Sequence, residues 1–159
     1  MLRLTVLGGL TLELEDGLVS GAMTQRRRLA LLALLAVARQ RGLSRDKVMA
    51  YLWPESDAAR ARHALNQLLY LQRRLLPGRE LFLGGKTLRL NPAVIGTDVG
   101  EFEDALDRGE LEAAVAVYGG AFLDGFFLKD VPAFEQWADL ERHRLARRLS
   151  GAQVGLANA

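Results

Sequence analysis

The chain opens with two short segments in which apolar and polar residues alternate. Residues 2–7 and 10–15 each place leucine or valine at every second position, and a period of two is typical of a strand with one buried face. Gly8-Gly9 separates the two segments, and Asp16-Gly17 indicates a second turn before the apolar pair Leu18-Val19. The pattern therefore predicts a small antiparallel β-meander.

Two helices are expected next, because the apolar positions change from a period of two to one near 3.6. Thr24 can cap a helix over residues 25–39, whose middle is almost entirely Leu and Ala, and Gly42 ends it. Ser44 caps a second helix, which Pro54 terminates because proline cannot continue a helix. The apolar run of the first helix is about ten residues long, too short to cross a bilayer, so we expect no membrane partner.

A third helix and a hairpin complete this region. Ser56 or Asp57 can cap a helix that continues to about Leu76. Residues 81–83 and 86–90 are short apolar runs on either side of a Gly-Gly pair, which is a strong hairpin signal. The predicted order is therefore strands, three helices and a hairpin.

The remaining chain is predicted to be helical. Asp98 can cap a helix to about Arg108, residues 111–118 form a second helix, and a loop rich in Phe and Gly follows at 121–129. A long helix begins near Pro132, a residue favoured in the first turn. Its apolar stripe is expected to contain Phe134, Trp137, Leu140, Leu145 and Leu149. Short paired helices of this kind resemble the start of an α-solenoid.

The net charge of +2 conceals an asymmetry between the two halves of the chain. Residues 1–95 carry fifteen Lys and Arg against seven Asp and Glu, whereas residues 96–159 carry six against twelve. We expect two domains with these bounds, of which the basic one suits a polyanion such as nucleic acid. The chain has no cysteine, which excludes disulfides, thiol nucleophiles and zinc–thiolate sites. We expect no cofactor and no metal.

The third predicted helix separates its residues into an apolar face and a polar face. With Leu65 as the reference, the apolar face contains Ala58, Ala61, Leu68, Leu69, Leu75 and Leu76. The opposite face holds His63, Asn66, Gln67, Tyr70 and Arg74, with Arg60, Arg62 and Arg73 on its flanks. No carboxylate occurs between Asp57 and Glu80, whereas an ordinary solvated face mixes acidic and basic residues.

This polar face predicts a DNA-reading helix. Arg, Asn and Gln can each make two hydrogen bonds to a purine edge in the major groove, and flanking arginines can reach phosphates. The hairpin carries Lys86 and Arg89, as a wing that contacts DNA would, and Arg26 and Arg27 begin the first helix, where they could meet phosphate. The alternatives are an Arg-rich surface helix without a special role and a solvated charge run at residues 26–28.

An ordered set of motifs resembles a known family of regulators. In the basic half these are Leu7-Gly8-Gly9-Leu10, residues 27–35, Leu43-Ser44-Arg45-Asp46, Leu52-Trp53-Pro54-Glu55 and Ala64-Leu65-Asn66-Gln67. They resemble the OmpR-like winged-helix domain of SARP-type activators. In the acidic half, Tyr118-Gly119-Gly120, residues 122–126 and the series Trp137, Glu141-Arg142 and Leu145 resemble the bacterial transcriptional activation domain that follows it.

The resemblance implies both a fold and a function. The fold would be an α+β winged helix-turn-helix, with an N-terminal β-meander and a C-terminal hairpin wing, followed by an all-α tetratricopeptide-like helical module. The protein would be a cytoplasmic, nucleoid-associated activator that binds double-stranded DNA at direct repeats. Its partners would be RNA polymerase subunits and a second copy of itself on DNA.

One position departs from the family pattern. The family has an Arg-Leu-Arg run late in the recognition helix, where this chain reads Leu71-Gln72-Arg73. Gln72 falls on the apolar side of the helix, so either the helix is rotated or Gln72 is a buried polar group that needs a partner. This affects the assignment of Tyr70 and Arg74 to the face that meets the bases.

Two other classes of function are weighed against DNA binding. An enzyme is disfavoured because His63 and His143 lie in different halves and because no phosphate-binding loop, metal-ligand spacing or nucleophile motif occurs. A module of winged helix and helical repeats that binds only proteins is the second alternative. The salt dependence of binding separates it from a DNA-binding protein, because contacts to phosphate release counterions.

Overall fold

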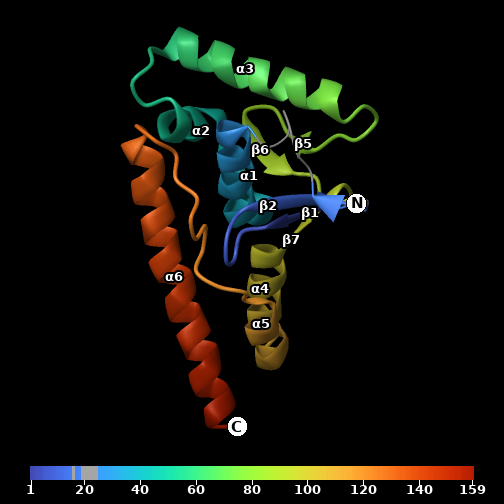
Figure 1. Cartoon of the computed structure of the whole chain (residues 1–159), viewed down its shortest axis with the longest axis vertical. Helices are drawn as coiled ribbons and strands as arrows, with labels where there is room; N and C mark the ends of the chain where they lie inside the picture. Colours follow the sequence, from blue (N-terminus) through green and yellow to red (C-terminus); the bar gives the residue numbers. More distant parts are fainter. Residues whose placement is uncertain (16, 19–24) are drawn as a thin grey trace.

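The computed structural model describes residues 1–15, 17–18 and 25–159, which form a mixed α and β fold (Figure 1). The first half contains β1 (Leu2–Thr5), β2 (Thr11–Leu14), β3 (Gly17–Leu18), α1 (Arg26–Ala38), η2 (Arg39–Arg41), β4 (Leu43–Ser44), α2 (Arg45–Leu52), α3 (Ala58–Leu75), β5 (Phe82–Leu83) and β6 (Thr87–Leu90). The second half contains β7 (Ile95–Thr97), α4 (Asp98–Asp107), α5 (Leu111–Val117) and α6 (Pro132–Ala157).

The predicted N-terminal meander is present and gains a fourth strand. The sheet has the order β3-β2-β1-β7, in which β1 pairs antiparallel with β2 and parallel with β7. Leu4 therefore lies opposite Leu12 on one side and Thr97 on the other. Val19, which was expected to extend β3, lies outside the described residues. The strand β7 was not predicted, because three residues give no periodic pattern.

Helix α1 is the centre of the hydrophobic core. Residues 29–36 are all buried, as expected for a helix whose apolar residues cover every face. The side chain of Gln25 caps the helix by accepting a hydrogen bond from the backbone N–H of Arg28. Thr24, the cap expected from the sequence, lies outside the described residues.

Helices α2 and α3 begin at caps that the sequence indicates. Ser44 caps α2, and Asp57, rather than Ser56, caps α3 by accepting from the backbone N–H of Arg60 at 2.8 Å. The predicted hairpin is β5–β6, and β4 adds to it in a three-stranded sheet of order β4-β6-β5. Gly84 closes the hairpin at a φ of +97°, where a side chain would collide with the carbonyl oxygen of Thr87.

Helix α4 begins one residue differently from the prediction. Thr97, not Asp98, is the cap, because its hydroxyl accepts from the backbone N–H of Gly100 at 3.0 Å. The buried carboxylate of Asp98 instead accepts hydrogen bonds from the backbone N–H groups of Val6 and Leu7, both at 2.9 Å. Asp98 thus ties the start of the helical half to the end of β1.

The loop before α6 closes over this same junction. Leu7 and Phe122 form an isolated antiparallel bridge, and the backbone N–H of Leu123 donates to the carbonyl oxygen of Val6 at 2.8 Å. A Cβ added to Gly120 would lie 2.9 Å from the Cα of Gly8, so the two backbones touch where glycines stand. The hydrophobic core is continuous across the junction. The expected domain boundary after residue 95 falls inside β7 and remains a prediction.

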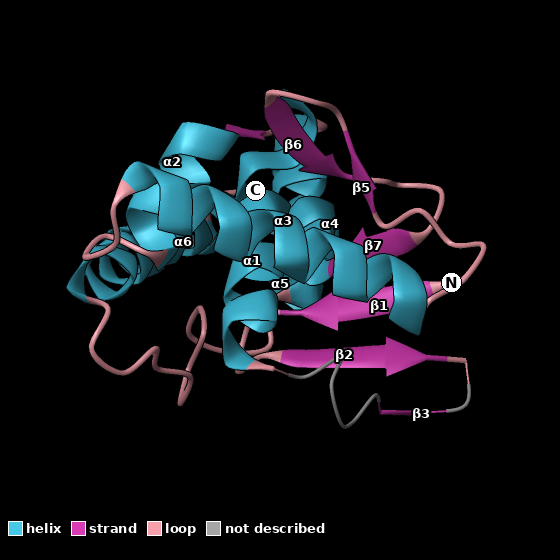
Figure 2. Ribbon diagram, turned by 90° about the horizontal axis from the view of Figure 1, so that it is seen from above, coloured by secondary structure: helices cyan, strands magenta, loops and turns pink. Residues whose placement is uncertain are grey.

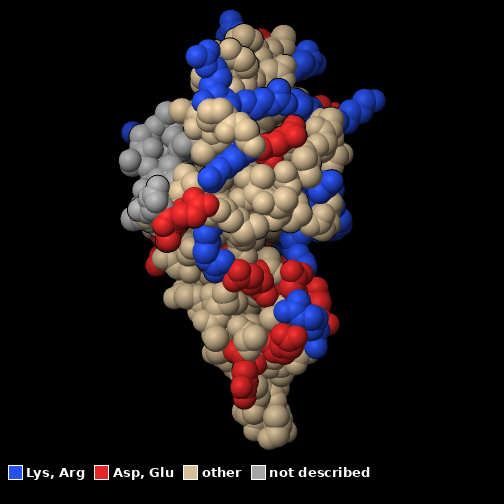
Figure 3. Space-filling view, turned by 90° about the vertical axis from the view of Figure 1, so that its right-hand side faces the viewer, with Lys and Arg blue, Asp and Glu red and all other residues tan. Residues whose placement is uncertain are grey.

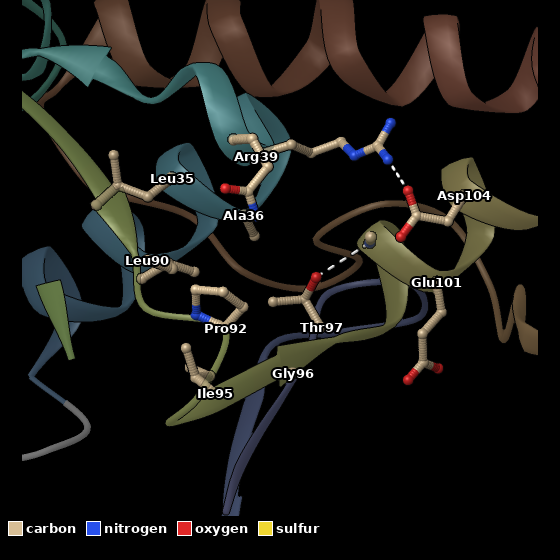
Figure 4. A pocket seen from close by; sticks show the side chains of 12 residues that line it. Leu35, Ala36, Arg39, Leu90, Pro92, Ile95, Gly96, Thr97, Glu101 and Asp104 are labelled. Atoms are coloured by element: carbon tan, nitrogen blue, oxygen red, sulfur yellow. Dashed lines mark hydrogen bonds and ion pairs between the residues drawn. The ribbon is translucent and has the colours of Figure 1, made fainter. Parts of the chain in front are cut away.

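A network of ion pairs joins the end of α1 to the helical half. Arg39 follows α1 and directs its guanidinium toward Asp104 on α4 (Figure 4). It also lies 3.6 Å from the buried carboxylate of Glu103 and 3.3 Å from the exposed carboxylate of Asp107. From α6, Arg144 approaches Glu103 to 2.7 Å. One buried carboxylate therefore holds arginines from two elements that are far apart in the sequence.

Helix α6 corrects one expectation about the core. Phe134 and Leu145 are fully buried, but Leu140 is 72% exposed. At 3.6 residues per turn, Leu140 lies about 140° around the helix from Leu145, on the opposite face. It was therefore wrongly placed in the apolar stripe. Among the described residues, no helix is long and apolar enough to cross a membrane.

Candidate nucleic-acid interface

Helix α3 lies on the outside of the molecule, across its end farthest from the C-terminus (Figures 1 and 2). It buries one stripe, which consists of Ala61, Leu65, Leu68, Leu69 and Gln72. The eight residues that the sequence assigned to DNA contact on this helix are all exposed: Arg60, Arg62, His63, Asn66, Gln67, Tyr70, Arg73 and Arg74. The helix thus presents a continuous face of arginines, amides, an imidazole and a phenol.

The burial of Gln72 decides between the two interpretations of that residue. Its side chain is 1% exposed, and its Nε2 has no hydrogen-bond partner among the described residues. It lines a cavity of about 20 Å³ beside Leu88 of the hairpin. Gln72 is thus a buried polar group, whereas Ala58 and Leu75, which were expected in the core, are exposed at the two ends of the helix. Tyr70 and Arg74 remain on the outer face.

One flank of α3 forms a groove with the hairpin and the start of α2. The groove has a volume of about 640 Å³, and its lining includes Arg62, Asn66, Lys86 and Arg45. Arg45 joins the three elements, because its Nη1 donates to Asn66 Oδ1 at 3.1 Å and its backbone N–H donates to the carbonyl oxygen of Lys86 at 2.9 Å. No pattern in the sequence predicts this role of Arg45.

The other flank of α3 faces the start of α1. There Arg27 lines a second cavity together with His63, Gln67 and Arg74. The guanidinium of Arg27 donates to the carbonyl oxygen of Leu52 at 3.1 Å, which fixes it beside the helix. The structure therefore brings Arg27 and Lys86 to opposite flanks of the same helix.

Two residues that were predicted to contact DNA, Arg26 and Arg89, do not lie beside the outer face of α3. Arg26 donates to the carbonyl oxygen of Phe127, and its guanidinium lies 4.7 Å from the ring of Phe126. It thus binds the loop before α6. Arg89 follows Leu88 on β6, and successive side chains of a strand point to opposite faces. Since Leu88 is buried toward α3, Arg89 points away from that helix. The structure does not bring Arg26 or Arg89 onto the face formed by α3.

The charges divide between the two ends of the molecule. Lys and Arg gather over the end that carries α3, and most of the Asp and Glu lie over the other half (Figure 3). The difference in charge between residues 1–95 and 96–159 is therefore also a difference between two ends of the folded molecule. A surface of this kind attracts a polyanion to one end and repels it from the other.

The overall arrangement of the elements has a counterpart among solved structures. No protein-family model matches the chain, and no curated protein sequence matches it. Among solved structures, it is similar to Mycobacterium tuberculosis EmbR in complex with a low-affinity phosphopeptide. The TM-score is 0.67 at 23% sequence identity, over 96% of this chain and 43% of the EmbR chain. The likeness shows the fold, and this chain spans less than half of EmbR.

Proposed function

We propose that this protein is a SARP-like transcriptional regulator that binds double-stranded DNA, with α3 in the major groove and the β5–β6 hairpin as a wing. The observation that carries the proposal is the outer face of α3, which has arginines and amides and no carboxylate between Asp57 and Glu80. The order α2, α3, hairpin is that of a winged helix-turn-helix. EmbR, whose fold this chain shares, is a regulator of the SARP type.

The geometry divides the contacts into two kinds. Asn66 and Gln67 stand on the outer face and can read base edges. Arg62 and Lys86 line the groove between α3 and the hairpin, and Arg27 lies across the helix. These cations are spaced to contact phosphates on both sides of the major groove.

The proposed second partner, RNA polymerase, would bind the helical half. α4, α5 and α6 form a tetratricopeptide-like module whose partner would be RNA polymerase, so the protein would act as an activator at promoter direct repeats. Two copies would then bind in tandem. The residues 1–95 and 96–159 would be the DNA-binding and activation domains, joined through Asp98 and Phe122.

Selection of bound duplexes from random DNA, followed by footprinting, tests this function. We expect an enriched direct repeat and an affinity that falls as salt rises, with a log–log slope near −0.9 for each phosphate contacted. A flat salt response without any enriched sequence contradicts DNA binding. Binding of proteins only would then be the remaining function of the fold.

A further inference from the structure

The flank of α3 that faces α1 contains an apolar floor that DNA reading does not require. A cavity of about 780 Å³ lies there, of a size that suits a small organic molecule. The floor is formed by Trp53, Ala64, Leu68, Leu71 and Leu75. Leu71 and Leu75 are 43% and 38% exposed. Leu71 and Leu75 lie one helical turn apart, so they form a small apolar patch rimmed by polar side chains, a kind of surface that a ligand can cover.

The rest of the cavity lining is cationic or neutral. It consists of Gln25, Arg27, Arg28, His63, Gln67 and Arg74, so the described residues that line it include no carboxylate. Neither Arg27 nor Arg74 forms an ion pair with a described residue. Arg27 is held over the ring of Trp53 at 5.9 Å, and Arg74 donates to the hydroxyl of Tyr70 at 3.4 Å. Two positioned guanidinium groups thus border an apolar floor.

We infer that this cavity binds a small amphipathic organic anion, one with an aromatic or acyl body and a single acidic group. The body would lie on Leu68, Leu71 and Leu75, where it removes apolar surface from water. The acid would accept hydrogen bonds from Arg27 or Arg74, since guanidinium groups match the geometry of carboxylate and sulfonate oxygens. A phosphodiester backbone fits less well, because it would leave the leucine floor exposed.

The position of the cavity gives the ligand a regulatory effect, a consequence that rests on the proposed function. Gln67, His63 and Arg74 line the cavity and also belong to the DNA-reading face. A molecule bound there would cover them, so ligand and DNA would exclude each other. The anion would act as a negative effector of DNA binding, with each ligand weakening the other by the same factor.

The probe for the first test is 8-anilinonaphthalene-1-sulfonate, an aromatic sulfonate whose fluorescence rises in apolar surroundings. We expect saturable binding of one probe per full-length chain. In a nitrogen-15 spectrum, the indole N–H of Trp53 should shift, whereas that of Trp137, which packs against Phe122 and Phe134 in the other half, should not. Shifts at Trp137 alone, or binding that does not saturate, overturn the site.

Substitutions separate the apolar and the charged contributions. Leu71→Gln should weaken the probe by about tenfold, as expected for the loss of one apolar contact surface. Leu140→Gln is the matched control, because Leu140 is an exposed leucine on α6, and it should leave the probe affinity unchanged. Arg74→Gln should reduce binding of the sulfonate and not of uncharged N-phenyl-1-naphthylamine. Equal effects of Leu71→Gln and Leu140→Gln exclude the proposed cavity.

Competition with DNA completes the experiment. A selected duplex should displace the probe from the wild-type chain, and the probe should no longer inhibit DNA binding by Leu71→Gln, which still binds DNA. If the wild-type chain binds no duplex while Trp53 still reports the probe, the proposed function fails and the ligand site stands. If the probe and the duplex bind together, the negative effect on DNA binding is wrong.

Discussion

Arg45 donates a hydrogen bond from Nη1 to Oδ1 of Asn66, at 3.1 Å, and so joins the start of α2 to the outer face of α3. This contact holds the oxygen of the Asn66 amide toward Arg45, and in the proposed complex the Nδ2 of Asn66 would donate to a base edge. A flank residue of the groove thereby orients a residue that is proposed to read sequence.

The first prediction concerns this contact. Arg45→Ala should lower the affinity for a selected duplex by about tenfold, because it removes a cation and leaves the amide of Asn66 without its support. Hydrogen exchange at residues 82–90 should also become faster, since the guanidinium of Arg45 donates through Nε to the carbonyl oxygen of Gly85 in the hairpin. Arg60→Ala is the control for the exchange measurement, because Arg60 is an exposed arginine of α3 whose one ion pair among the described residues is with the cap Asp57. Equal exchange in the two variants would show that Arg45 does not support the hairpin.

A second prediction separates base contacts from phosphate contacts. Gln67→Ala should reduce the preference for the selected sequence by roughly 1–3 kcal/mol while the salt dependence stays unchanged. Arg62→Ala should weaken binding to selected and scrambled duplexes similarly and make the salt dependence shallower by about one ion. Titrations of both duplexes over a series of salt concentrations measure the two effects. The assignment of the helix faces is wrong if the two variants behave alike.

A third prediction concerns acid stability. The pKa of Asp107 is lowered from its ordinary value of 3.8, chiefly because it accepts a hydrogen bond from Arg39 and also because Arg148 lies beside it. An acid with a lowered pKa in the folded state stabilises the fold above its unfolded-state pKa and loses that contribution as pH falls through the folded-state pKa. The contribution of Asp107 should therefore be complete above pH 3.8 and disappear below it.

Denaturant unfolding over a pH series measures this effect. Asp107→Asn should be less stable than the wild-type chain at neutral pH, and the difference should shrink as the pH falls below 3.8. Asp124→Asn is the control, because Asp124 forms no ion pair with a described residue. A difference between Asp107→Asn and the wild-type chain that is constant at every pH would show that the ion pairs are not its source.

A fourth prediction tests the junction between the two halves. Phe122→Ala should reduce the free energy of unfolding by about 3–5 kcal/mol, since Phe122 is fully buried beside Leu7. Phe127→Ala should change it by less than about 0.5 kcal/mol, because that ring is 59% exposed. Calorimetry of both variants should also show one unfolding transition. Two separate transitions would mean that the halves fold independently.

The elements that could be predicted are those whose pattern is local. The long helices and the β5–β6 hairpin follow from apolar periodicity and turn residues close in the sequence, and the structure places their ends within a few residues of the prediction. The strands β4 and β7 could not be predicted, because they have two or three residues and depend on partners elsewhere in the chain.

The same distinction between local patterns and contacts of distant segments applies to the candidate site. The outer face of α3 follows from helical geometry, so its residues could be assigned from the sequence. The role of Arg45 depends on three elements that meet only in the folded chain, and the position of Arg26 depends on the loop at Phe127. Such contacts between distant segments have no signature in the sequence.

The junction at Leu7 and Phe122 also fixes the direction in which α6 extends relative to α3. Helix α6 has 26 residues, about 39 Å at 1.5 Å per residue, and it runs from the α2 side of the molecule toward the opposite end (Figure 1). Because the junction is a packed core and not a hinge, α6 keeps a constant angle to α3. On a direct repeat, α6 of every bound copy would point in the same direction along the double helix. On an inverted repeat, α6 would point in opposite directions in neighbouring copies. The orientation of the DNA site would thus set the direction in which α6 extends from the DNA.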